Sequence, residues 1–162
     1  MCNVIKQLHR ALFKVETWFL IISFTVMGII MALQVFSRAI LGKSIVWSEE
    51  LTRHIFIWST FIGMSYGVAR MSHINLDYFI LKIAPMPRKA IAIIMDVILL
   101  GALFVLFRAS IIYVGDQIEI AGPTTGYSMG YVMLAMPVSC VLASIHSVHN
   151  IVQKIVTFKS ER

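Results

Sequence analysis

Four ionisable residues lie close together at the start of a long apolar segment. Glu49, Glu50, Arg53 and His54 fall within the stretch WSEELTRH at positions 47–54. In a helix, Glu49 with Arg53 and Glu50 with His54 are i, i+4 pairs, which puts all four on two adjacent stripes within ~8 Å of helix length. An ionisable group beside hydrocarbon is costly unless it is paired, reaches the interface or faces other protein. We therefore predict that this end of the segment contacts another chain.

Helix capping is the alternative explanation for part of this motif. Ser48 is a good N-cap residue, and Glu49 and Glu50 in a first turn suit the positive end of the helix dipole. A structural cap therefore explains all three residues. It does not need Arg53 or His54, so we favour the interaction site over capping alone.

Small residues and two tryptophans follow in the same segment. Ser59, Gly63 and Gly67 recur every four residues and form a stripe that allows another helix to approach closely. Packing within the protein is slightly favoured over packing against a partner. Trp47 and Trp58 are explained as an interfacial belt residue and a packing residue respectively. None of the five residues indicates chemistry.

The composition predicts an all-α integral membrane protein. The 162 residues are 59% hydrophobic and 14% charged, with a mean hydropathy of +0.84, whereas soluble domains contain about 25% charged residues. Each apolar segment is near the ~20 residues that cross ~30 Å of hydrocarbon. The chain is thus predicted to be one four-helix membrane domain over residues 1–162, with transmembrane helices at about 18–36, 47–70, 90–113 and 130–152.

Basic residues set the predicted orientation. Ten of the 14 Lys and Arg residues flank the spans on one side and two lie on the other, so both termini are predicted to be cytoplasmic. The net charge of +6 then reflects topology and contact with anionic lipid, and no nucleic-acid partner is expected. Between the second and third spans, residues 72–89 could form an interfacial segment or extend the second helix, and the sequence leaves both alternatives open.

Two charges lie within the third span. Asp96 and Arg108 are twelve residues apart, ~18 Å along a helix, so they cannot pair directly. We expect each to be part of a structural ion pair, with Arg70 or Arg88 as the partner of Asp96 and Glu49 or Glu50 as that of Arg108. A proton or ion relay is the less favoured alternative.

No motif predicts an enzyme, a metal site or a cofactor. The chain has five histidines, and paired haem ligands would have to face each other at matching depth. His73 with His146 could meet that condition, but no axial-ligand motif surrounds them. Cys2 and Cys140 cannot meet in this topology. A haem-binding anchor of a respiratory oxidoreductase is the alternative function, whereas a small multidrug antiporter would need an acid within 18–36, which has none.

The sequence resembles the small membrane subunit of the tripartite ATP-independent periplasmic (TRAP) transporters. The resemblance covers mainly residues 37–89, and it rests on the order and spacing of several short motifs. These are Ser37-Arg38, Trp47-Ser48-Glu49-Glu50-Leu51, Trp58 with Phe61-Ile62-Gly63, Ala69-Arg70, and His73-Ile74-Asn75-Leu76-Asp77.

This resemblance implies a bacterial inner-membrane protein that scaffolds a much larger subunit. That subunit would carry the substrate and Na⁺ sites and move as an elevator, and a periplasmic binding protein would deliver an organic acid such as a C4-dicarboxylate or sialic acid. We assign the contact with the large subunit to Trp47, Glu49, Glu50, Arg53, Trp58, Ser59, Gly63 and Gly67. Structural charge pairs are assigned to Arg38, Arg70, His73, Asp77, Asp96 and Arg108.

Overall fold

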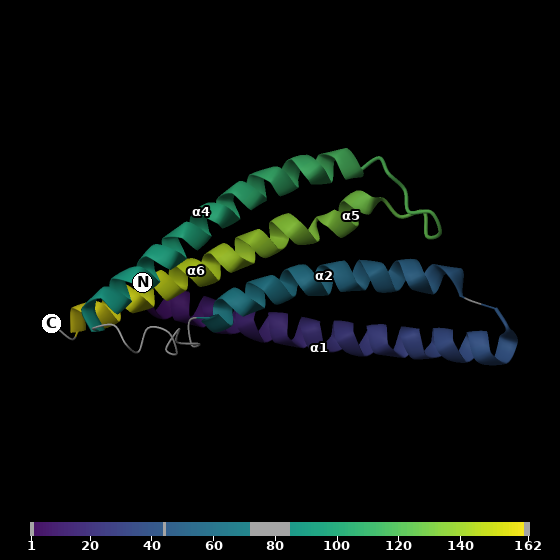
Figure 1. Ribbon diagram of the computed structural model, residues 1–162, viewed down its shortest axis with the longest axis horizontal. Coiled ribbons are helices and arrows are strands. Elements are labelled where there is room, and N and C mark those ends of the chain that lie inside the picture. Colours follow the sequence, from purple (N-terminus) through teal and green to yellow (C-terminus); the bar gives the residue numbers. More distant parts are fainter. Residues whose placement is uncertain (1, 44, 72–84, 161–162) are drawn as a thin grey trace.

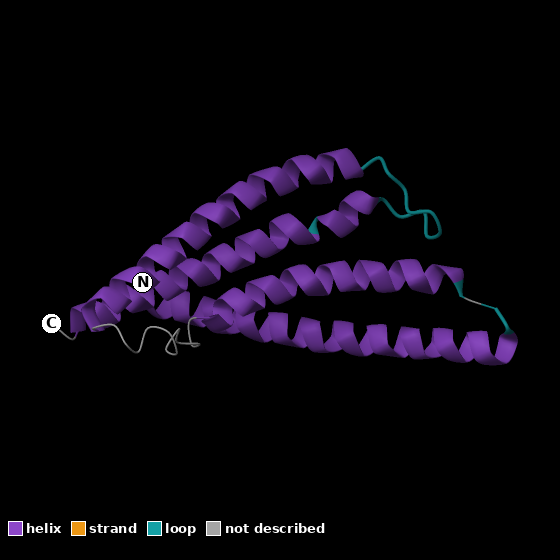
Figure 2. Cartoon of the chain, in the orientation of Figure 1, coloured by secondary structure: helices purple, strands orange, loops and turns teal. Residues whose placement is uncertain are grey.

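The protein is built from long helices, and its computed structural model describes residues 2–43, 45–71 and 85–160. Within these ranges the chain forms helices and loops without a strand (Figures 1 and 2). The prediction of an all-helical chain is therefore confirmed. The helices are α1 (Cys2–Leu41), α2 (Val46–Met71), α4 (Pro85–Gln117), α5 (Met129–Met133) and α6 (Ala135–Ser160).

The long helices are arranged as two antiparallel hairpins. α1 packs against α2, and α4 packs against α5 and α6, while α6 also packs against α2 and joins the two hairpins. The hairpins lie close together at the end that carries both chain termini and diverge toward the opposite end (Figure 1). We call these the inner and outer ends of the bundle.

Within the described residues, three helices are long and apolar enough to cross a membrane. The membrane-compatible segments are Gln7–Ile40, Ile93–Gln117 and Met129–Val156. α2 has 26 residues, the same length as α6, but the charges of its first turns and its Ser and Gly residues make it less apolar. Residues 72–84, which include His73, Asp77 and most of the segment predicted to be interfacial, lie outside the described residues.

The first helix is much longer than the predicted span of 18–36. α1 contains 40 residues, about 60 Å of helix, which exceeds the ~30 Å of hydrocarbon in a bilayer. It ends before Gly42, whose φ of 63° is left-handed and favours glycine. The segment before residue 18 is thus part of the helix and packs against the rest of the bundle.

The second helix begins two residues before the predicted cap. α2 starts at Val46, so Ser48 lies in its first turn. The Ser48 hydroxyl donates a hydrogen bond to the carbonyl of Ile45 at 2.7 Å, whereas an N-cap side chain accepts from a backbone N–H. The prediction that Ser48 is the N-cap is therefore wrong.

The last predicted span, 130–152, is interrupted near its outer end. α5 and α6 are separated at Leu134, three residues before Pro137. Proline lacks the N–H that would bond to the carbonyl four residues earlier, so the continuous ladder stops there. Ser128 caps α5, since its hydroxyl accepts from the N–H of Gly130 at 3.2 Å.

A buried apolar cluster joins the two hairpins. Val68 of α2, Leu103 of α4, and Cys140 and Ala143 of α6 form the buried apolar cluster. Close approach of helices through small side chains is typical of membrane bundles. Seven serines are also buried among the described residues: Ser23, Ser48, Ser59, Ser65, Ser110, Ser139 and Ser147.

Candidate functional site

The outer end of α2 exposes a pair of opposite charges. Glu49 and Arg53 are both exposed, and no ion pair joins them among the described residues. They line a groove of about 480 Å³ between α1 and α2, together with apolar residues that include Met31 and Phe56. Methionine adapts its shape to a partner surface. This groove therefore combines an adaptable apolar wall with two unpaired charges.

Glu50 has a different environment from its neighbour Glu49. Its side chain is only 5% exposed, and its Oε2 accepts from the backbone N–H groups of Thr124 and Thr125 at 2.8 and 2.9 Å. The Thr125 hydroxyl donates to Oε1 at 2.8 Å, and His54 Nε2 lies 3.8 Å from the same oxygen. We assigned Glu50 to a contact with another subunit, but its carboxylate is used within the chain to hold the α4–α5 loop.

The α4–α5 loop is shaped around this carboxylate. An isolated antiparallel bridge joins Ala121 to Ser128, and Gly126, with φ 70°, turns the chain between them. A Cβ atom at Gly122 would collide with the Glu50 carboxylate. Glycine at this position is therefore a requirement of the close approach between the loop and α2.

The small-residue stripe of α2 is used within the chain at two of its three positions. Ser59 is buried and its hydroxyl bonds to the carbonyl of Ile55. A Cβ at Gly63 would lie 3.9 Å from Leu20 of α1, whereas one at Gly67 would meet no atom within 4 Å. Ser59 and Gly63 therefore lie against other parts of this chain, whereas Gly67 faces open space.

The two tryptophans of α2 differ in exposure. Trp47 is exposed at the outer end, next to Glu49, while Trp58 is half-buried. Only Trp47, Glu49 and Arg53 of the assigned contact residues therefore present largely accessible side chains at the outer end.

A buried polar cluster occupies the inner end of the bundle. Glu16 of α1 is 3% exposed and His146 of α6 is 0% exposed. Glu16 Oε1 accepts from the Ser65 hydroxyl of α2 at 2.7 Å and lies 3.3 Å from His146 Nε2. One carboxylate thus ties three helices together.

Histidine rings extend this cluster toward the inner surface. His9 of α1 stacks on His149 with ring centroids 4.1 Å apart and meets His146 edge-on at 4.7 Å. Asn150 donates to the carbonyl of Val68 at 3.1 Å, and Gln153 Nε2 lies 3.2 Å from His149 Nε2. These contacts hold α1, α2 and α6 against one another at the level where the hairpins meet.

The cluster has the chemistry of a structural network. Among the described residues, no group of three or more His, Cys, Asp and Glu side chains is placed to hold a metal ion. His146 faces Glu16 and His9, and its suggested haem partner His73 lies outside the described residues. Stacked parallel rings such as His9 and His149 cannot direct their nitrogens at one ion.

The charge pairs differ from those expected. Asp96 Oδ2 lies 2.6 Å from Lys154 Nζ of α6. Lys154 is thus the ion-pair partner of Asp96, whereas we expected Arg70 or Arg88. Arg38 and Arg70 are exposed in the last turns of α1 and α2, where a cation complements the helix dipole. Arg108 is exposed and has no ion pair among the described residues.

Sequence reasoning missed Glu16, Ser65 and Lys154. A signal was present in the spacing, because His9, Phe13 and Glu16 recur at four and three residues on α1. On α6, His149 and Asn150 follow His146 by three and four residues, and Gln153 follows His149 by four. Such spacing places polar groups on one face of a helix, which indicates that these faces pack against each other.

The comparisons with known proteins identify a family over most of the chain. Residues 10–157 match the family described as "Tripartite ATP-independent periplasmic transporters, DctQ component". The sialic acid TRAP transporter small permease protein SiaQ of Vibrio cholerae is 28% identical over 108 residues. That alignment covers 63% of this chain and 61% of SiaQ.

In two further relatives the match to this chain covers a smaller fraction of the relative's length. The sialic acid TRAP transporter permease protein SiaT of Haemophilus influenzae is 24% identical over 117 residues, which are 72% of this chain but 19% of SiaT. The C4-dicarboxylate TRAP transporter small permease protein DctQ of Pseudomonas aeruginosa is 36% identical over 47 residues, 29% of this chain and 22% of that protein. The chain therefore spans less than two thirds of the length of each of these relatives.

Proposed function

The chain belongs to the DctQ-component family of the TRAP transporters, and from this premise we propose that it scaffolds a large membrane subunit during uptake of an organic acid. The family is a transporter component and not an enzyme, and the chain is a multi-pass protein of the inner membrane. The family match favours this role over that of a haem-binding respiratory anchor. The length of SiaT supports the proposal of a larger partner, because the 117 residues that match this chain make up only 19% of SiaT.

The proposed substrate is an organic acid of the sialic acid or C4-dicarboxylate class. SiaQ and SiaT carry the first substrate in their names and DctQ of P. aeruginosa the second. In our proposal a periplasmic binding protein delivers the acid, Na⁺ drives its uptake, and the large subunit holds the ion sites. No cofactor is proposed for this chain.

The observation that carries the scaffold role is the outer groove between α1 and α2, with its unpaired charges Glu49 and Arg53.

Co-purification with the large subunit tests the proposed contact. We expect Arg53→Glu to lower the yield of the complex at least tenfold, because a like-charge contact in an interface costs several kcal/mol, and about 1.4 kcal/mol is a factor of ten. Lys43→Glu, a charge reversal at an exposed position in the α1–α2 loop, is the matched control and should leave the yield unchanged. Equal yields for both variants, with normal membrane insertion, would place the contact elsewhere.

We also propose that α2 crosses the membrane as a fourth span and that both termini are cytoplasmic. The 26 residues of α2, about 39 Å of helix, run antiparallel beside α1 (Figure 1). Its inner end carries Arg70 near the basic residues that precede the apolar part of α1, as the positive-inside rule requires.

Cysteine labelling in intact spheroplasts separates four spans from three. In a Cys-free background, Lys43→Cys and Tyr127→Cys should both react with a membrane-impermeant thiol reagent, and Asn3→Cys should not. If α2 stayed on one side of the membrane, the two loops would lie on opposite sides. Labelling of Lys43→Cys without Tyr127→Cys would therefore reject the four-span proposal, and labelling of Asn3→Cys alone would reverse the orientation.

A further inference from the structure

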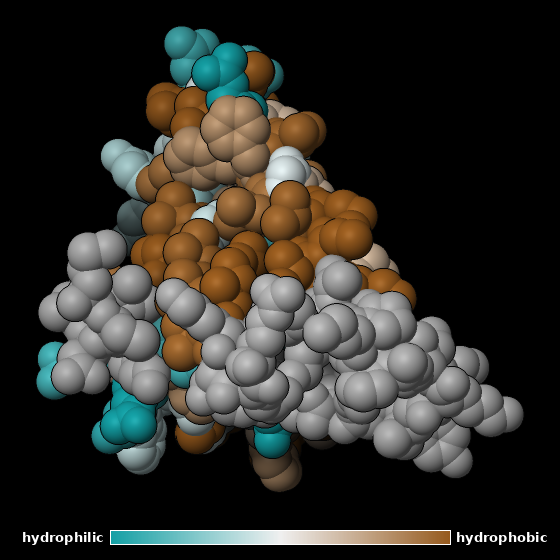
Figure 3. Space-filling view, turned by 90° about the vertical axis from the view of Figure 1, so that its left-hand side faces the viewer, coloured by the Kyte–Doolittle hydropathy of each residue, from teal (hydrophilic) through white to brown (hydrophobic). Residues whose placement is uncertain are grey.

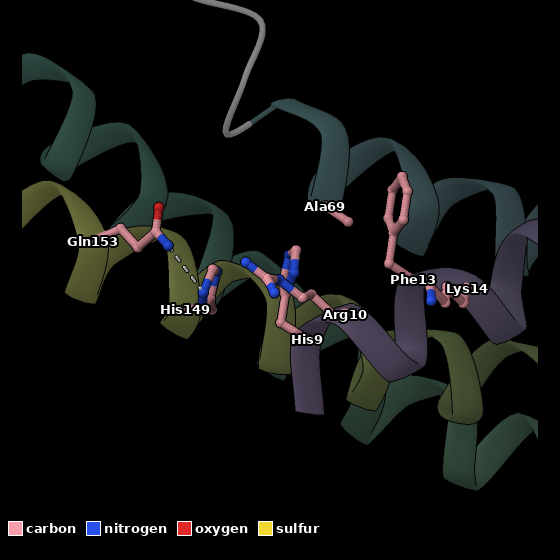
Figure 4. A pocket seen from close by; sticks show the side chains of 7 residues that line it. All are labelled: His9, Arg10, Phe13, Lys14, Ala69, His149 and Gln153. Carbon is pink, nitrogen blue, oxygen red and sulfur yellow. Dashed lines mark hydrogen bonds between the residues drawn. The ribbon is translucent and has the colours of Figure 1, made fainter. Parts of the chain in front are cut away.

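The inner end of the bundle contains a basic pocket next to the buried polar cluster. The pocket has a volume of about 390 Å³ and lies between α1, α2 and α6 (Figure 4). Arg10 and Lys14 of α1 supply its cationic wall, with His149 and Gln153 of α6 and the apolar side chains of Phe13 and Ala69.

The two cations of this pocket are available to a ligand. Arg10 and Lys14 are one helical turn apart, so their side chains lie on the same stripe of α1. Both are exposed, and neither has a hydrogen bond or ion pair in the part of the chain that the structure describes. None of the described residues that line the pocket is acidic, and the nearby carboxylate of Glu16 is bound to Ser65 and His146.

The position of the pocket along α1 matches the level of lipid headgroups. Trp18, which is 64% exposed, follows Lys14 by four residues, about 6 Å of helix, and exposed tryptophans mark the membrane interface. Seen from the inner end, hydrophobic residues cover much of the described surface (Figure 3). The pocket therefore lies where a charged headgroup would be held beside an apolar surface.

We propose that this pocket binds a phosphate group, supplied by an anionic phospholipid of the inner leaflet. Arginine forms paired hydrogen bonds with phosphate oxygens, and lysine adds a point charge. Basic pockets between transmembrane helices on the cytoplasmic side bind such headgroups. The volume is at the low end of the range for small-ligand sites, roughly 300–1,000 Å³, which suits a headgroup, while the acyl chains remain outside along α1.

Lipid titration of the full chain tests the proposal. The purified protein in neutral detergent is titrated with phosphatidylglycerol, and the lipid-bound fraction is measured by native mass spectrometry. The double substitution Arg10→Gln with Lys14→Gln should weaken binding about 25-fold. Each basic residue near an anionic lipid contributes about 1 kcal/mol, which is roughly a factor of five in affinity, and the two factors multiply. The exchange Arg10→Lys with Lys14→Arg, which retains both charges, should restore most of the binding.

A matched control removes the same two residue types at the other end of the bundle. Arg38→Gln with Lys43→Gln alters two exposed side chains outside the pocket and should change the affinity less than twofold. Equal affinity of the wild type and the Arg10→Gln, Lys14→Gln variant for phosphatidylglycerol would contradict the proposal that a phospholipid supplies the phosphate group. If inorganic phosphate then raised the melting temperature of the wild type but not of that variant, the phosphate site would stand with a soluble ligand. The absence of both effects would refute the site.

Discussion

Liposomes that contain this chain alone should show no Na⁺-driven uptake of sialic acid or C4-dicarboxylates above protein-free liposomes. Liposomes that also contain the large permease subunit, and are supplied with the binding protein, should take up the substrate. One reason is that the buried carboxylate of Glu16 already contacts Ser65 and His146 of the same chain. Another reason is that the basic residues Arg10 and Lys14 and the charged residues Glu49 and Arg53 line openings at opposite ends of the bundle, away from its middle.

The measurement is the uptake of radiolabelled substrate with an inward Na⁺ gradient. Liposomes with the chain and the large subunit but no binding protein separate the membrane steps from substrate delivery. Carbonate extraction and protease protection confirm that the lone chain has inserted. Robust uptake by the lone inserted chain would contradict the scaffold role.

The apolar parts of the helices could be predicted because their hydropathy favours membrane-spanning helices. The spans predicted at 90–113 and 130–152 lie within α4 and within the segment of α5 and α6, since uninterrupted apolar stretches of that length have few alternatives to a helix. The extension of α1 before residue 18 was not predicted. A basic segment with Lys6, Arg10 and Lys14 looks like a flanking region, and its packing face becomes visible only when α6 is placed beside it.

Pairing between distant residues could not be predicted from the sequence. Depth in the membrane restricted the partners of Asp96 without choosing among them, and the choice of Lys154 depends on how α4 and α6 are rotated. The same holds for Glu50. Local spacing suggested an outward-facing charge, but the partner of its carboxylate is a loop 74 residues later in the chain, and only the closed hairpin arrangement brings the two together.

Replacement of Glu16 by alanine should have the other large effect, a decrease in the free energy of unfolding. Glu16→Ala removes the partner of both Ser65 and His146, which are fully buried. Breaking a buried pair by removing one partner costs about 3–5 kcal/mol, and interhelical hydrogen bonds in membranes average only about 0.6 kcal/mol. Because this carboxylate serves two groups and its loss leaves a cavity, we expect Glu16→Ala to lower the free energy of unfolding by about 3 kcal/mol, at the lower end of the first range. Ser65→Ala should cost about 0.6 kcal/mol.

Unfolding by SDS in mixed micelles, followed by far-UV circular dichroism, gives these free energies. Glu119→Ala removes an exposed carboxylate from the α4–α5 loop and should stay within about 0.5 kcal/mol of the wild type, as surface substitutions usually do. Since Ser65 loses its acceptor when Glu16 is replaced, the double variant should be nearly as stable as Glu16→Ala alone. If Glu16→Ala behaved like Glu119→Ala, the inner cluster would not hold α1 to α2 and α6, and the length of α1 before residue 18 would need another explanation.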